Sequence, residues 1–177
     1  MKPRKIGRLF GLVFATTGSF VLLAAPARAK TTIGADLDYG HSAGSGIGGG
    51  WGFGVRVGQR LHVPLLALDP EIGFTYHNFS EGLSPTMYRG IAGLRLGFLE
   101  VVRPGVYGHL GVGRIDFAQL PDASHTAFTY DFGLFLDITV IPYLDLGVHA
   151  GYQGIASGDR VDAVNWVTAG GHAAFVF

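Results

Sequence analysis

Apolar and polar side chains alternate at every second position through most of the chain after residue 30. Successive side chains of a strand point to opposite faces, so a period of two predicts β-strands with one apolar face. Glycine is spread through these stretches, where it would weaken a helix. Eight segments carry an alternate series that is apolar and free of charge: 33–39, 51–57, 66–76, 88–98, 106–112, 128–138, 144–152 and 167–177.

The opposite series holds most of the charge of the segments. Its members predicted to share one face are Asp36, Asp38, Arg56, Asp69, Glu71, Arg89, Arg95, Asp131, Asp137 and Asp145, with His77, His109, His149 and His172. In a soluble sandwich or barrel the apolar series would form the core and the charges would face water. In an outer-membrane barrel the apolar series meets lipid and the charges line a narrow interior.

The connections between segments alternate in length. Those after the second, fourth and sixth segments are short, around residues 61–64, 99–103 and 139–141. Those after the odd segments are longer, as at 41–50, 117–126 and 154–165. Short turns on one side and long loops on the other are typical of outer-membrane barrels.

Aromatic residues of the apolar series gather beside the long connections. Aromatic girdles lie at the membrane interfaces of such barrels. The predicted girdle consists of Tyr39, Trp51, Phe53, Tyr76, Tyr88, Phe128, Tyr130 and Tyr152. A soluble core would have no reason to collect its aromatic side chains at one rim.

Proline marks the expected start of three strands. Pro70, Pro104 and Pro142 each follow a short connection, and proline is tolerated at the first residue of a strand. We therefore expect the membrane-embedded part to begin just after each of them. The eighth strand must pair with the first, because an open edge in lipid would leave backbone groups unsatisfied. The sequence thus predicts an all-β, eight-stranded antiparallel up-and-down transmembrane β-barrel.

Residues 1–29 have the pattern of a cleaved signal peptide. A basic start precedes an apolar stretch, and Ala27-Arg28-Ala29 supplies small residues for cleavage. These residues hold five of the thirteen Lys and Arg and none of the thirteen Asp and Glu, so residues 30–177, the barrel domain, carry a net charge of −5. A basic nucleic-acid footprint is absent. With no cysteine, disulfides and thiolate chemistry are excluded as well.

With these features, residues 30–177 resemble the small Gram-negative outer-membrane barrels of the outer-membrane protein A/X-like and W-like families. The resemblance rests on the alternation, the loop asymmetry and the terminal "AAFVF". It implies location in the bacterial outer membrane and contact with its lipid and lipopolysaccharide. It also implies that Phe175 and Phe177 form part of the signal read by the outer-membrane assembly machinery. The wall-anchoring role of two-domain members does not carry over, since no such domain follows Phe177.

Charges inside an eight-stranded barrel must pair, because such a barrel is only wide enough for side chains to fill it. Arg60 and Arg103 join the predicted lumen residues as partners for the carboxylates. The favoured interpretation is an ion-pair network that plugs the lumen of a monomeric structural or surface-interaction protein. The leading alternative is a narrow pore for ions or small solutes. Acidic loop residues, Glu81, Asp116, Asp122, Asp159 and Asp162 against Arg114 and Arg160, leave a cation or another cell surface as possible partners.

Other candidate chemistry is weaker. Counted from the prolines, the four histidines do not lie at one height, so we assign no metal or cofactor site and expect polar lumen histidines. Some barrels of this type modify lipopolysaccharide, and that activity would need a Ser–His pair at the lipid rim. The adjacent pairs, His41-Ser42 and Ser124-His125 beside Asp122, fall in predicted loops, so an enzyme is the third interpretation. "GSGIGG" (44–49) matches a dinucleotide-binding pattern without the helix this requires, and we expect a flexible loop.

Overall fold

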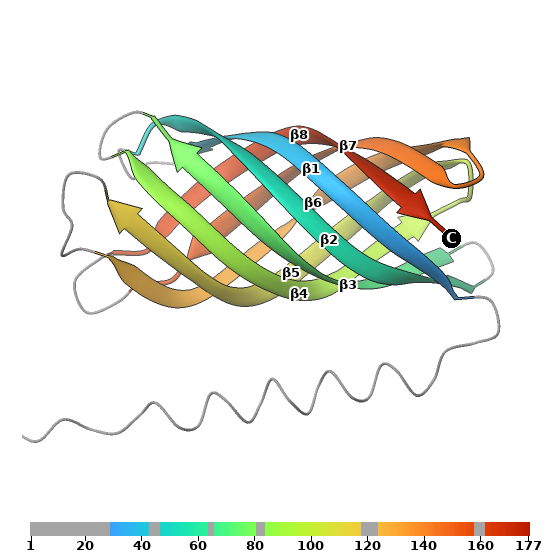
Figure 1. Cartoon of the computed structure of the whole chain (residues 1–177), viewed down its shortest axis with the longest axis horizontal. Coiled ribbons are helices and arrows are strands. Elements are labelled where there is room, and N and C mark those ends of the chain that lie inside the picture. The colour runs from blue at the N-terminus through green and yellow to red at the C-terminus, as the bar shows by residue number, and fades with distance from the viewer. Residues whose placement is uncertain (1–28, 43–46, 64–65, 81–83, 118–123, 158–161) are drawn as a thin grey trace, which may run out of the picture.

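The computed structural model describes residues 29–42, 47–63, 66–80, 84–117, 124–157 and 162–177. These residues form a closed antiparallel barrel in which the strands follow one another in chain order (Figure 1). The strands are β1 (Lys30–Ser42), β2 (Gly49–Val63), β3 (Leu66–Phe79), β4 (Pro85–Phe98), β5 (Val102–Phe117), β6 (His125–Ile141), β7 (Leu144–Ile155) and β8 (Val164–Val176). The predicted eight-stranded barrel is confirmed. No helix in this part of the chain is long and apolar enough to cross a membrane.

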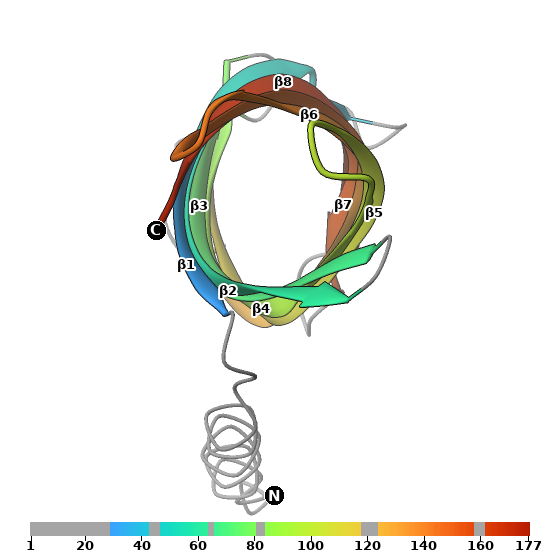
Figure 2. The ribbon, with the colours of Figure 1, turned by 90° about the vertical axis from the view of Figure 1, so that its right-hand side faces the viewer.

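The barrel closes between its first and last strands, as expected. Figure 2 shows the ring end-on, with β1 beside β8. The register pairs Thr32 with Val176 and Ser42 with Trp166 at its two ends. Beyond it, Thr31 N donates to the Phe177 carbonyl oxygen at 2.7 Å, and Phe177 N donates to that of Thr31 at 3.0 Å. Closure therefore includes the last residue of the chain and removes the unpaired edge that lipid would not tolerate.

The outer face of the barrel is apolar. Leu134 is 64% exposed, Ile72 is 66% exposed and Leu37 is 59% exposed, while the charged residues of the opposite series are buried or nearly so. A soluble protein rarely exposes a contiguous apolar patch of more than a few hundred Å². This surface encircles the barrel, so the apolar series faces outward, as expected for a lipid-facing surface.

The prolines do not all mark the strand starts. Pro70 lies within β3, four residues after Leu66, and Pro104 is the third residue of β5, whereas Pro142 lies in the turn before β7. The expectation that the strands begin after them is therefore wrong for Pro70 and Pro104, while β7 does begin after Pro142. The Pro70 side chain is tolerated because Asp69 and Pro70 have no paired residue on β2, while both pair with β4. A proline removes only one donor from a ladder.

The connection lengths confirm the predicted asymmetry. Residues 64–65, 99–101 and 142–143 link strands at one end, and 43–48, 80–84, 118–124 and 156–163 link them at the other. The strands extend further than the sequence suggests, because Arg114 and Asp116, assigned to a loop, belong to β5. We call the two ends the short-turn end and the long-connection end.

Candidate functional site: the lumen and its outer mouth

Ion pairs fill the interior near the short-turn end. Arg60 of β2 lies 3.0 Å from Asp69 and 2.7 Å from Asp145. Arg103 of β5 contacts two carboxylates, Asp145 at 3.1 Å and Asp137 at 2.5 Å. All five side chains are at most 7% exposed. Each carboxylate thus bridges different strands, and the group forms one connected network across the barrel.

A second set of pairs crosses the middle of the lumen. Arg56 contacts Asp36 and lies 3.5 Å from Glu71. His109 lies between two carboxylates, with Nε2 2.8 Å from Glu71 and Nδ1 2.5 Å from Asp131. Both ring nitrogens therefore face acceptors, an arrangement that only the doubly protonated imidazolium satisfies with two donors.

Every lumen residue predicted from the sequence faces inward and has a charged or imidazole partner. Further contacts are Arg89 to Asp131 at 3.4 Å, Arg95 to Asp137 at 3.3 Å, and Asp38 to His77 at 2.7 Å. A buried pair need not stabilise a fold more than apolar residues would, but removing one partner leaves a charge buried and unpaired. The arrangement therefore depends on all its members together.

Three lumen side chains gather where the barrel closes. Asp36 of β1, His149 of β7 and His172 of β8 place ligand atoms within 4.8 Å of one another. His149 Nδ1 lies 3.3 Å from His172 Nδ1. Spacing from the prolines does not predict this juxtaposition, because the register between strands sets the position of each histidine along the barrel axis. Asp36 pairs directly with His172, and His149 pairs with Gly170, two residues before His172 on β8.

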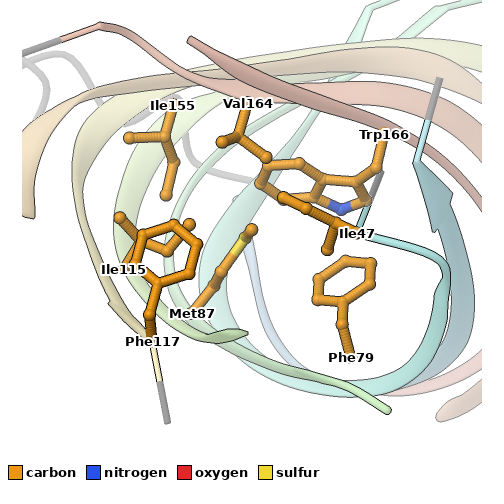
Figure 3. Close-up of a cluster of buried hydrophobic side chains, with 8 residues drawn as sticks. All are labelled: Ile47, Phe79, Met87, Ile115, Phe117, Ile155, Val164 and Trp166. Atoms are coloured by element: carbon orange, nitrogen blue, oxygen red, sulfur yellow. The ribbon is translucent and has the colours of Figure 1, made fainter. Parts of the chain in front are cut away.

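A cluster of apolar side chains occupies the long-connection end of the interior (Figure 3). Its members are Ile47, Phe79, Met87, Ile115, Phe117, Ile155, Val164 and Trp166, all at most 7% exposed. We call this group the mouth cluster. Trp166 lies 5.9 Å from Phe79 and 5.8 Å from His77, centroid to centroid, and the Arg89 guanidinium carbon lies 5.2 Å from the Trp166 ring. Trp166 therefore joins the apolar cluster to the charged lumen.

The mouth cluster could have been found in the sequence. Phe79, Met87, Ile115, Phe117, Ile155, Val164 and Trp166 share the inward parity of the charged series, but only at the ends of strands that meet long connections. Ile47 falls in "GSGIGG", where we expected a flexible loop. Residues 43–46 lie outside the described residues, but Ile47 itself is 2% exposed and packs into the barrel, so that expectation is wrong for Ile47.

Little space remains between these two fillings. A cavity of about 50 Å³ lies in the lumen, lined by residues that include Asp36, Arg56 and His149. It has room for roughly three to five water molecules. A larger hollow of about 560 Å³ opens at the short-turn end beside Lys30, Arg60 and Arg103.

The eight aromatic residues of the predicted girdle lie on the outer face toward the long-connection end. They form two groups of cross-strand ring contacts, with distances given between ring centroids. On β1 to β4, Tyr39 lies 5.4 Å from Trp51 and Tyr76 lies 5.2 Å from Tyr88. On β6 and β7, Tyr130 lies 6.5 Å from Tyr152. On β5 the outward position at this height is Arg114, whose side chain is 55% exposed and lies 2.8 Å from Asp116. Arg114, which the sequence led us to expect in a loop, therefore lies on the outer face of β5.

His41 and Ser42 do not form a catalytic pair. Both belong to β1, so the expectation that they fall in a loop is wrong, whereas Ser124 lies in the connection before β6 and His125 is the first residue of β6. Neighbours on a strand point to opposite faces. His41 is accordingly exposed and Ser42 buried, with the Ser42 hydroxyl donating to the Asn165 carbonyl oxygen at 3.4 Å. Asp122 lies outside the described residues, as do Glu81, Asp159 and Arg160.

No family model and no curated protein matches the chain. Solved structures do. Neisserial surface protein A is 16% identical over 84% of this chain and 97% of its own, with a TM-score of 0.60. The outer membrane enzyme PagL is 15% identical over 78% of this chain and 97% of its own, with a TM-score of 0.56. The attachment invasion locus protein Ail of Yersinia pestis is 16% identical over 85% of this chain and 99% of its own, with a TM-score of 0.52.

The chain has the fold of the small outer-membrane β-barrels. Its encircling apolar belt and closed strand edge meet the physical demands of that environment. Fold and surface together place the barrel in a bacterial outer membrane.

Proposed function

We propose that this outer-membrane barrel is a non-conducting structural or surface-interaction protein that presents its long connections outside the cell. The observation that supports this most is the double filling of the interior. The mouth cluster packs the outer end, and the ion pairs cross the remainder. Ion passage would require both fillings to move.

The energetics favour a closed lumen. The mouth cluster removes large apolar side chains from water, each contributing roughly 1.5–3 kcal/mol. It also keeps water from the lumen pairs beneath it, such as Arg89 with Asp131, and electrostatic attraction strengthens where water is excluded. A permeating ion would have to replace contacts of both kinds.

A narrow pore remains the second candidate, because the hollow beside Arg60 and Arg103 already opens one end of the lumen. On this alternative, the mouth cluster would act as a gate. The pore and the closed barrel differ in whether the native protein conducts.

Single-channel recording in planar lipid bilayers separates them. We expect the native protein to insert without conductance steps, and the double variant Phe79→Ala/Trp166→Ala to show conductance steps. Phe132→Ala is the matched control, since Phe132 is an aromatic residue on the outer face with 56% exposure. Insertion is verified by the heat-sensitive gel mobility of the folded barrel. Reproducible steps from the native protein would refute the closed lumen.

Several finer assignments belong to the same proposal. Residues 1–29, of which 1–28 lie outside the described part, act as the cleaved signal peptide. The outward aromatic residues form the interfacial girdle, in contact with lipopolysaccharide. Phe175 and Phe177, 57% and 63% exposed, serve as the assembly signal, and the barrel is a monomer. The likeness to PagL extends to fold alone, so enzyme activity is not part of the proposal.

A further inference from the structure

The three side chains at the closing seam bring two histidine nitrogens and a carboxylate close together. Asp36, His149 and His172 come from β1, β7 and β8; β7 and β8 are consecutive strands, and β1 lies beside β8 only once the barrel has closed. The two rings lie 5.5 Å apart, centroid to centroid, and are inclined by 32°, so they neither stack flat nor meet edge-on. The two Nδ1 atoms lie 3.3 Å apart.

The outer ring nitrogens indicate which nitrogen carries hydrogen. His172 Nε2 lies 2.6 Å from Asp137 Oδ1, a distance that requires an N–H donor. Arg95 Nη2 also lies 3.3 Å from His172 Nε2, but a guanidinium has no acceptor to offer and is the more distant partner. A neutral His172 therefore has its lone pair on Nδ1, which points at His149.

The environment of His149 favours the same tautomer. Its Nε2 lies 3.6 Å from Asp38 Oδ2, too far for a hydrogen bond, so a hydrogen on Nε2 gains an electrostatic attraction to that carboxylate. With that tautomer in both rings, two lone pairs meet at 3.3 Å and repel unless a cation lies between them. The alternative is a direct hydrogen bond in which His149 Nδ1 carries the hydrogen.

The separation fits a metal ion. Two imidazole nitrogens bound at 2.0–2.1 Å in tetrahedral geometry lie about 3.3–3.4 Å apart. Metal-binding histidines also donate their other nitrogen to a carboxylate or carbonyl, as His172 does to Asp137. We propose that Asp36, His149 and His172 bind a divalent transition-metal ion, with Zn²⁺ as the best match, and that water completes the coordination.

The charge of the lumen favours a bound cation. Among the described residues, seven carboxylates (Asp36, Asp38, Asp69, Glu71, Asp131, Asp137 and Asp145) share the interior with five arginines (Arg56, Arg60, Arg89, Arg95 and Arg103). The His109 imidazolium supplies one further positive charge, so the set keeps an excess of negative charge. Asp36 can turn toward the metal because its partner Arg56 also contacts Glu71, and the 50 Å³ cavity borders both Asp36 and His149.

A glycine on the neighbouring strand leaves space for the His172 side chain. Gly147 pairs with His172 across β7 and β8. A Cβ at Gly147 would lie 2.6 Å from His172 Nε2 and 2.5 Å from Asp137 Oδ1, so a larger residue would displace the very contact that fixes the tautomer. Because the ligands come from both sides of the closure, the ion binds only the closed barrel and stabilises it by mass action.

The test uses barrel purified in detergent from membranes of cells that express the full chain. The protein is unfolded in urea with a chelator, desalted, and refolded without metal, with Zn²⁺ or with Co²⁺. Refolding in the presence of the ion avoids any need for the ion to pass the filled lumen. Bound metal is counted by elemental mass spectrometry, affinity is measured by chelator competition, and Co²⁺ reports its geometry through its visible absorption.

We expect one Zn²⁺ per folded barrel, intense tetrahedral Co²⁺ bands and slower unfolding of the zinc-loaded protein. His149→Gln and Asp36→Asn are expected to weaken Zn²⁺ binding at least tenfold. His77→Gln, which removes another lumen histidine, keeps native binding, and gel mobility confirms that each variant folds. A folded native barrel that retains no stoichiometric metal would overturn the proposal in favour of the direct hydrogen bond. So would an equal loss of zinc in His77→Gln; if the ligand variants do not fold, the native stoichiometry and Co²⁺ spectrum decide.

Discussion

Replacing Leu134 with arginine tests whether the apolar face meets lipid. Leu134 lies in the middle of β6, on the outer face, with neighbours Val106 and Ala150 on the flanking strands. At 64% exposure it leaves no cavity in the interior when it is replaced. The substitution therefore isolates the cost of placing a charge against the surroundings of the barrel.

The expected cost follows from depth. An arginine on the lipid face of a barrel costs about 2–4 kcal/mol near the bilayer midplane and about 0–1 kcal/mol near the interfaces. The folding equilibrium should fall by about 30- to 700-fold, since each 1.4 kcal/mol is a factor of ten. Val140→Arg is the matched control, because Val140 is 56% exposed on the same face, one residue from the end of β6.

Denaturant titration of refolding into lipid vesicles measures both variants. Trp51, 63% exposed on the outer face, reports insertion through its fluorescence, and an unchanged m-value shows that the same surface is buried. If the face met water, both arginines would be tolerated within about 0.5 kcal/mol. Equal costs at Leu134 and Val140 would likewise refute the assignment of a membrane midplane.

Three further outcomes are expected. Asp145→Asn should cost about 3–5 kcal/mol in equilibrium unfolding, because it leaves two buried arginines short of a counter-charge, whereas Asp116→Asn, in an exposed pair, should cost less than about 1 kcal/mol. Gly147→Ala should destabilise the barrel by about 1–3 kcal/mol, while Gly90→Ala, whose Cβ meets nothing within 4 Å, should be nearly neutral in the same titration. Deleting Phe177 removes two backbone hydrogen bonds to β1 and should slow the appearance of the heat-sensitive folded form; an unchanged rate would contradict its role in closure and assembly.

The orientation of side chains was predictable because the strand period is two. Once Leu37 is assigned outward, Asp36 and Asp38 must point inward, and the structure agrees. Arg114, expected in a loop, lies on the outer face of β5 in the structure. Its position at the rim, beside Asp116, explains how a charge is tolerated there. Lipid-facing charges are costly only at depth.

Heights along the barrel were not predictable, because they depend on register between strands. The histidines illustrate this: His77 and His149 each follow a proline by seven residues, whereas the strand pairing brings His149 to His172. The mouth cluster was missed for a different reason. Apolar residues on the inward parity contradict a simple rule of polar lumen and apolar exterior, and that rule fails where the interior itself must be sealed.

The two fillings of the lumen form one physical unit, joined at Trp166. The Trp166 ring packs against Phe79 in the mouth cluster and also contacts the Arg89 guanidinium. Arg89 in turn pairs with Asp131, and Asp131 pairs with His109. Water admitted at the mouth would weaken these ion pairs first, because their electrostatic attraction is strongest where water is excluded. Conversely, an unpaired Arg89 would draw water toward Trp166. Closure of the mouth and pairing of the lumen are therefore coupled, which is why a barrel with this much internal charge can remain closed.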